Sequence, residues 1–473
     1  MTLRSCAFAL IGLACLLRGE VVVNDVHSRL NETTVREVVS PRSSAEVVAA
    51  VKRATSISIS GARHSMGGQQ FAADSTHLDM RSMNRFLALD AEKGIASVEP
   101  GITWPQLVAE LETRQTQEPW TIRQKQTGAD ELTIGGAVST NIHGRGLTWQ
   151  PFVADLESLT LVKVDGAIVT VSRTENAELF RLVVGGYGLF GVIVEVKLRL
   201  IKRMTVERVV EVRPLAGIAT GIAERIRDGF VLGDFQFCPD EKSPGFLKEG
   251  VFSCYRPVAA TATSAPTKLT PDAWRKLIVE AHSDKANAWA RYKSYYLGTN
   301  GQTYFHDRAQ FNHYDADYHE RVRAALPELP TGSLMISEVY VPIARLEDFM
   351  QTVATDFRER GTNVIYGTIR FIKKDTDTFL PWAREDFACI VFNLRVTHTA
   401  DGIEKAKGDF RKLIDRALER KGSFFLTYHR WATKEQITAA YPQFAEFLKR
   451  KRTHDPRELF QSEWYRHWRT ELD

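Results

Sequence analysis

The chain has 473 residues, of which 44% are hydrophobic and 25% charged, and its 62 Lys and Arg against 58 Asp and Glu give a net charge of +4. This composition is that of a globular protein and excludes a disordered chain, collagen and a coiled coil. The length predicts roughly two to four domains, with room for a large cofactor. So small a net charge disfavours nucleic-acid binding, which needs a basic stripe or domain.

Residues 1–21 differ from the rest of the chain. Arg4 precedes an apolar run over residues 5–17, which is shorter than a membrane span of ~20 residues and fits the hydrophobic part of a secretory signal. If retained, this run would be the protein's contact with a membrane. A secreted or periplasmic protein, an anchored protein, and a cytoplasmic protein with a superfluous extension all remain open.

Residues 22–203 predict an α+β domain, because short β-rich runs alternate with helical segments. The expected strands are residues 57–60, 77–80, 86–90, 95–99, 156–164, 168–172 and 192–201, and the expected helices are 45–54, 104–112 and 176–183. Residues 91–94 and 164–166 each separate two alternating runs and end in glycine. These two turns predict hairpins.

After Met204 the glycine density falls. Strands are expected at residues 206–212, 334–341, 364–372, 387–397 and 423–429, and helices at 217–227, 346–360, 402–419 and 444–452, with a Pro- and Thr-rich loop at 257–271. This pattern indicates one antiparallel sheet with helices on one face. The basic run 449–452 is expected to be a solvated helix face.

The sequence contains few signs of metal binding. Its five cysteines, at positions 6, 15, 238, 254 and 389, form no Cys-x-x-Cys pair. Neither a zinc site nor a disulfide framework is therefore expected.

Residues 186–191 match Gly-x-Gly-x-x-Gly, the dinucleotide fingerprint of the Rossmann fold. That fingerprint requires a strand before it and a helix after it, so that pyrophosphate lies at the helix N-terminus. Here the predicted helix comes first and the predicted strand follows. A Rossmann site is therefore not expected.

Two other glycine-rich loops are better placed to bind a ligand. Residues 60–69 directly follow a predicted strand, so their backbone N–H groups could surround a diphosphate. Residues 127–146 are dense in Gly, Ser and Thr, which lets the backbone approach a flat or charged ligand. Either loop alone could be a tight connection, but the two in one domain favour ligand binding.

Three segments carry a resemblance to a known family. Gly61-Ala62-Arg63-His64-Ser65, then Thr133-Ile134-Gly135-Gly136-Ala137 with His143-Gly144, then residues 185–193 resemble, in order and spacing, the FAD-binding domain of the vanillyl-alcohol oxidase type. The resemblance spans about residues 38–203 and resumes at residues 455–460. Within the family the chain is most similar to the sugar-alcohol and aldonolactone oxidases and their bacterial relatives.

The resemblance implies a particular domain order. A two-subdomain FAD-binding domain of the PCMH type would occupy residues 22–203, and a substrate-binding cap with an antiparallel sheet flanked by helices would occupy residues 204–430. Residues 431–473 would return to the FAD domain, and the aromatic run 464–468 would pack against it.

The resemblance also implies FAD as the cofactor. The residues expected to bind it are Gly61, Ala62, Arg63, His64, Ser65, Met66, Gly67, Gly68, Thr127, Gly128, Thr133, Gly135, Gly136, Ser139, Thr140, His143, Gly144, Gly191 and Ile193. In the family the histidine at the place of His64 often bonds covalently to the flavin 8α-methyl group. The alternative is that His64 only donates a hydrogen bond, and Arg63 departs from the small residue more usual before it.

The implied activity is oxidation of a polar alcohol, such as a sugar, an alditol or an aldonolactone, by hydride transfer to flavin N5. The reduced flavin would be reoxidised by O₂ or another acceptor, and Ile142, which is bulky where the family places a residue beside the flavin, favours a dehydrogenase.

The catalytic residues are expected in the cap. A strand would put Tyr366, Thr368 and Arg370 on one face, so that Arg370 could orient the substrate hydroxyl; Lys374 or His398 would be the base. The subfamily has Glu where this chain has Thr368. That departure keeps open an alternative, a flavin-binding protein without alcohol-oxidase activity.

Overall fold

The computed structural model describes residues 20–115, 119–262, 269–312 and 317–472. The apolar run 5–17 lies outside them. Among the described residues, no helix is both long and apolar enough to cross a membrane. The three cysteines in this part of the chain, Cys238, Cys254 and Cys389, are buried and unpaired.

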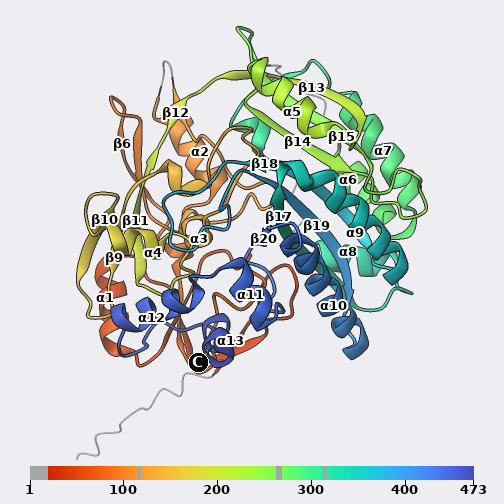
Figure 1. The fold of residues 1–473 in the computed structure, drawn as a ribbon. Coiled ribbons are helices and arrows are strands. Elements are labelled where there is room, and N and C mark those ends of the chain that lie inside the picture. The colour runs from red at the N-terminus through yellow and green to blue at the C-terminus, as the bar shows by residue number, and fades with distance from the viewer. Residues whose placement is uncertain (1–19, 116–118, 263–268, 313–316, 473) are drawn as a thin grey trace, which may run out of the picture.

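The fold is α+β, as the sequence predicts, with two halves that lie side by side (Figure 1). The N-terminal half holds a small parallel sheet, in the order β3 (Glu37–Val39), β5 (Thr76–Asp79) and β4 (Ile57–Ser60). Beside it lies an antiparallel sheet in the order β10 (Ile168–Ser172), β9 (Leu156–Val162), β11 (Val192–Arg199), β7 (Ile95–Val98) and β6 (Phe86–Asp90). Both predicted hairpins, β6–β7 and β9–β10, are confirmed.

The helices of this half are α1 (Ser44–Arg53), α2 (Trp104–Thr113), α3 (Ile134–Thr140) and α4 (Ala177–Val183). Residues 186–191 connect α4 to β11, so the helix does precede the strand and the context of a Rossmann site is missing. The sequence predicted only a loop where α3 forms. Thr133 caps this helix by accepting a hydrogen bond from the Gly136 N–H group.

The second half is built on an eight-stranded antiparallel sheet, and we call this half the cap. The strand order is β16 (Thr303–Phe305), β13 (Thr205–Pro214), β15 (Glu249–Pro257), β14 (Leu232–Phe237), β18 (Val364–Ile372), β19 (Phe387–Thr397), β17 (Gly332–Pro342) and β20 (Ser423–Phe424). The predicted strand at residues 423–429 stops at Phe424, and the next residues leave the sheet.

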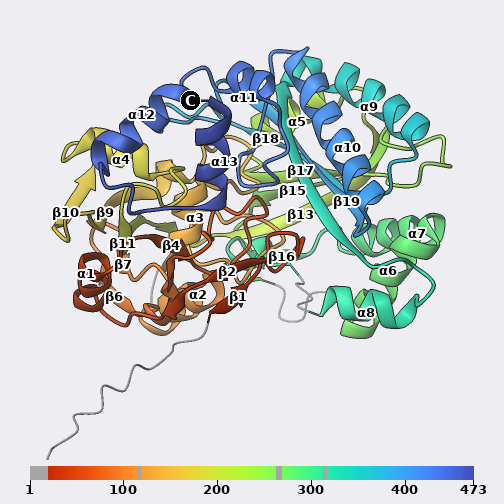
Figure 2. The ribbon, with the colours of Figure 1, turned by 90° about the horizontal axis from the view of Figure 1, so that it is seen from below.

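Helices cover both faces of this sheet, whereas the sequence predicted helices on one face only. On one face lie α5 (Ile218–Arg227), α9 (Leu346–Arg360) and α10 (Ala400–Leu418), and on the other α6 (Pro271–Ser283) and α7 (Lys285–Leu297), with α8 (Tyr318–Ala325) beside α6 (Figure 2). The helices α6 to α8 have no counterpart among the predicted elements.

The C-terminal helices α12 (Phe444–His454) and α13 (Glu463–Leu472) lie along the N-terminal half, whereas α11 (Lys434–Ala440) packs against α10 of the cap (Figure 1). Phe460 forms a parallel bridge with Ile57 at the edge of β4, and Trp464 packs against Tyr187 with ring centroids 5.0 Å apart.

The basic run in α12 is not a fully solvated face, because the side chain of Lys451 is completely buried. It forms an ion pair with Asp455 at 2.5 Å. The carboxylate of Asp455 also accepts hydrogen bonds from the backbone N–H groups of Leu459 and Phe460, which fixes the segment that follows α12. This pair therefore holds the segment that returns to β4.

A cavity between the N-terminal half and the cap sheet

A cavity of about 510 Å³ lies between the two halves. On one side it is lined by the two glycine-rich loops and by residues 187–193. On the other side it is lined by strands β14, β17, β18 and β19 and by helices α6 and α7. The two glycine-rich loops and the inner face of the cap sheet therefore share one space.

Most of the residues expected to bind FAD line this cavity. They are Gly61, Ala62, Arg63, His64, Ser65, Thr127, Gly128, Thr133, Gly135, Gly136, Ser139, Thr140, His143, Gly191 and Ile193. Met66, Gly67, Gly68 and Gly144 do not line it. The first three pack against the C-terminal part of the chain, where Met66 donates a backbone hydrogen bond to Thr427, and Gly144 packs against Gln124 and Lys125.

The N-terminal wall fits a ligand with many hydrogen-bonding groups. A side chain at Gly61 would collide with Thr133, and one at Gly135 would collide with Pro100, so glycine lets these segments meet while leaving the cavity open. The hydroxyl of Thr127 and the Nε of Arg63 are buried with no hydrogen-bond partner among the described residues. Orphaned polar atoms beside a cavity are explained by a polar ligand, and the ribityl diphosphate of FAD is one.

His64 lies in this wall with its Nδ1 2.8 Å from the Nε2 of His27. Burial, and next the neighbouring His27, lower the pKa of His64 well below its ordinary value of 6.5. The imidazole is therefore neutral at physiological pH, and a neutral ring nitrogen is nucleophilic.

The cap wall contains the three residues predicted to share one face of β18. Tyr366, Thr368 and Arg370 all line the cavity. Arg370 is 7% exposed, and its Nε and the Thr368 hydroxyl have no hydrogen-bond partner within the described residues. Two further buried acceptors without a partner there, Asp234 Oδ1 and Gln236 Oε1 on β14, face the same space.

Neither predicted base lines the cavity, and this corrects the expectation. Strand β18 ends at Ile372, so Lys374 lies past the sheet, where it is exposed and its N–H group donates to Asp386. His398 follows the end of β19, which runs away from the cavity, and its Nε2 lies 2.9 Å from Ser333 Oγ in a separate hollow.

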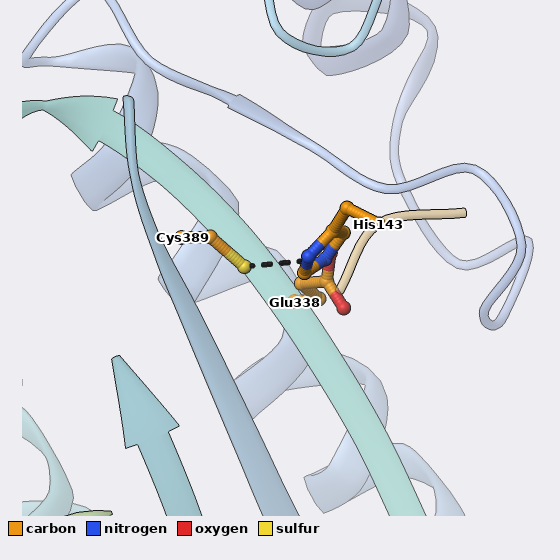
Figure 3. Close-up of side chains that lie close together, drawn as sticks. All are labelled: His143, Glu338 and Cys389. Atoms are coloured by element: carbon orange, nitrogen blue, oxygen red, sulfur yellow. Dashed lines mark hydrogen bonds and ion pairs between the residues drawn. The ribbon is translucent and has the colours of Figure 1, made fainter. Parts of the chain in front are cut away.

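A buried carboxylate that the sequence analysis did not single out does line the cavity. Glu338 on β17 is 4% exposed, and its Oε1 lies 2.9 Å from His143 Nε2. Cys389 Sγ on β19 lies 3.5 Å from the same nitrogen, and Figure 3 shows these three side chains pointing toward one another. The available signal was local: Leu334, Ile336 and Glu338 alternate along one strand face, so a carboxylate follows two apolar residues into the cavity.

A ring nitrogen of His143, a carboxylate oxygen of Glu338 and the Sγ of Cys389 lie within 4.8 Å of one another. Tyr340 donates its hydroxyl hydrogen bond to Oε1 of Glu338, and Tyr428 donates one to Oε2 at 3.2 Å. Oε1 of Glu338 thus faces His143 and Tyr340, while Oε2 faces Tyr428.

Comparison with known proteins agrees with the architecture of the N-terminal half. Residues 35–172 match a family model described as an FAD binding domain. An uncharacterized oxidoreductase of the fasciation locus of Rhodococcoides fascians is 34% identical over 34% of this chain and 37% of its own length.

Two other relatives have named activities. L-gulonolactone oxidase of Mus musculus is 30% identical over 27% of this chain and 28% of its own length. L-gulono-1,4-lactone dehydrogenase of Mycobacterium tuberculosis is 29% identical over 42% of this chain and 44% of its own length. The chain thus matches less than half the length of each of these relatives. The N-terminal half thus contains an FAD-binding domain of the vanillyl-alcohol oxidase (PCMH) type.

Proposed function

We propose that the protein is an FAD-dependent oxidoreductase that oxidises a CH–OH group of a polar, polyhydroxylated substrate. The observation that carries this proposal is the shared cavity, in which the glycine-rich loops face the buried Arg370 of the cap sheet. The names of the gulonolactone relatives support a sugar-acid lactone or a related polyhydroxylated compound as substrate.

In this proposal residues 22–203, with the returning segment 431–473, hold the cofactor, and residues 204–430 hold the substrate. The loops around Gly61 and Thr133 would lie along the diphosphate and ribityl chain. When bound, FAD supplies the hydride acceptor and passes the electrons on to O₂ or another acceptor. Side chains of the cap would bind and orient the substrate.

Arg370 would bind the substrate hydroxyl. Its guanidinium is buried, so its attraction for negative charge on the oxygen is stronger than it would be in water. Thr368, Asp234 and Gln236 offer oxygen atoms in the same space that have no partner in the described part of the chain. A substrate with several hydroxyl groups would satisfy them, whereas a purely apolar alcohol would leave them buried and unpaired.

The test is anaerobic reduction of the protein-bound flavin by a panel of aldonolactones, alditols, sugars and simple aliphatic alcohols. We expect the flavin absorbance to bleach with at least one polyhydroxylated compound. If photoreduction bleaches the flavin but no compound of the panel does, the protein binds flavin without this activity and the proposal fails.

We further propose that His64 bonds covalently to FAD. After acid denaturation, flavin fluorescence is expected to remain with the polypeptide of the wild type and to leave it in His64→Ala. His77, buried on the neighbouring strand and away from the cavity lining, provides the matched control, and His77→Ala should keep any fluorescence on the chain. Release of all flavin from the denatured wild type would reduce His64 to a non-covalent contact.

Ile142 lines the cavity beside His143 and is 5% exposed. If its side chain shields the flavin from O₂, Ile142→Gly should accelerate reoxidation of the photoreduced protein by O₂. Stopped-flow mixing with oxygenated buffer measures this rate directly. An unchanged rate would show that Ile142 does not decide between oxidase and dehydrogenase behaviour.

A further inference from the structure

Glu338 is held in the cavity wall by donors from three separate parts of the chain. His143 belongs to the N-terminal half, Tyr340 to β17 itself, and Tyr428 to the segment after β20. The same segment is fixed to β17 by a backbone hydrogen bond from the Phe425 N–H group to the Glu338 carbonyl. The position of this carboxylate is thus determined from both sides of the cavity.

These donors keep the carboxylate ionised. Burial alone raises the pKa of Glu338, but the charge of His143 and the hydrogen bonds from His143 and Tyr340 outweigh burial and lower the pKa below its ordinary value of 4.5. The other titratable groups that interact electrostatically with Glu338 are Arg370, Cys389, Tyr428, Tyr187 and Tyr441.

The two ring nitrogens of His143 face two different oxygen atoms. Its Nδ1 lies 3.0 Å from the Gly144 carbonyl and its Nε2 lies 2.9 Å from Glu338 Oε1. Both partners can accept hydrogen bonds when the carboxylate is ionised. The ring of His143 is thus held in one orientation between the Gly144 carbonyl and Glu338.

The register of the cap sheet relates Glu338 to the acidic residue that the sequence lacks at Thr368. Glu338 on β17 and Thr368 on β18 both pair with Val391 of the intervening strand β19. Both line the cavity, together with Arg370 two residues farther along β18. A carboxylate is thus present at the same level of the sheet, two strands away.

We propose that Glu338 is the catalytic base of this site: it takes the hydroxyl proton of the substrate while the C–H hydride leaves for FAD. The O–H and C–H bonds of the alcohol break, a C=O bond forms, the proton ends on Glu338 Oε2, and the two electrons leave with the hydride. Within the described residues Oε2 accepts a hydrogen bond from Tyr428, and Glu338 lines the cavity, so this oxygen can also face a substrate hydroxyl. Arg370 would hold the oxygen from which the proton departs. This proposal rests on the proposed oxidoreductase function.

The test compares Glu338→Gln with Glu249→Gln, which makes the same change on strand β15 outside the cavity, where Glu249 pairs with Lys293. Both variants should keep wild-type FAD content, because Gln has nearly the shape of Glu, whereas Glu338→Gln should melt at a lower temperature because it loses a buried charge and an acceptor oxygen. With the compound that bleaches the wild type, we expect Glu338→Gln to lower the anaerobic rate of flavin reduction by ~10²–10⁴-fold, the usual contribution of a general base. Glu249→Gln should leave that rate unchanged.

A second readout follows the proton itself. Time-resolved infrared spectra recorded while the substrate reduces the wild-type flavin should show a transient protonated-carboxyl C=O stretch, which is absent in Glu338→Gln. If Glu338→Gln is slow but the wild type shows no such band, Glu338 is a positioning residue and the proposal is overturned.

Tyr428→Phe tests the same assignment without touching the carboxylate. Loss of a donor to Oε2 destabilises the ionised form, so the pKa of Glu338 rises and the acid limb of the rate profile should move to higher pH by about one unit. An unmoved limb would contradict the role of Glu338. If no compound bleaches the wild type, the oxidoreductase function fails first; if the wild type is bleached and Glu338→Gln is equally fast, only the base assignment fails.

Discussion

Replacement of Arg370 by Met is expected to lower the rate of anaerobic flavin reduction by about 10²–10³-fold, the range measured when a donor to a developing oxyanion is removed. Met keeps an unbranched stem of similar width but removes the charge and all five N–H donors. FAD content should not change, because the cofactor loops belong to the N-terminal half. Stopped-flow absorbance at the flavin band measures the rate.

The matched control is Arg395→Met on the adjacent strand β19. Arg395 lies outside the cavity and donates to the Pro330 carbonyl. We expect this variant to reduce flavin at the wild-type rate. Arg370→Lys should fall between wild type and Arg370→Met, because Lys keeps the charge but cannot reproduce the planar fork of donors. Equal rates for Arg370→Met and the wild type would remove Arg370 from the mechanism.

Replacement of Asp455 by Ala is expected to give the largest loss of stability. It removes the hydrogen-bonded carboxylate partner of the fully buried Lys451, and breaking such a pair from one side costs about 3–5 kcal/mol. It also removes the acceptor of the Leu459 and Phe460 N–H groups, so the bridge to Ile57 should loosen. Urea unfolding followed by tryptophan fluorescence gives the change in the free energy of unfolding.

Glu446→Ala on the same helix serves as the control. Glu446 pairs with Arg450 at the surface, and exposed pairs of this kind contribute about 1 kcal/mol or less. A loss of stability in Asp455→Ala no larger than that in Glu446→Ala would contradict the role assigned to the buried pair. A lowered affinity for FAD in Asp455→Ala, but not in Glu446→Ala, would show that the returning segment supports the loops that bind the cofactor.

Local patterns along the chain predicted much of the fold. Strands β6, β10, β18 and β19 and helix α9 begin and end at the predicted residues, because each alternates or repeats clearly and is bounded by turn residues. Helix α3 was missed because Gly135 and Gly136 weaken its helical pattern, while its cap at Thr133 and the packing around it stabilise the helix.

The candidate site was only partly predictable, because it depends on contacts far apart in the sequence. The glycine-rich loops can be recognised locally. The approach of Glu338 to His143 cannot, because 195 residues separate them and only the register of the cap sheet and the meeting of the two halves bring them together. Lys374 was misplaced for a related reason, since a strand end two residues earlier takes its side chain out of the cavity.

The central claim is that the cavity between the two halves binds FAD. The most direct test is the absorbance spectrum of the purified protein, with the flavin quantified after denaturation and the colourless fraction titrated with FAD. We predict a yellow protein with about one FAD per chain, or a colourless one that binds FAD stoichiometrically and quenches its fluorescence. A folded protein that contains no flavin and does not bind added FAD would contradict the account.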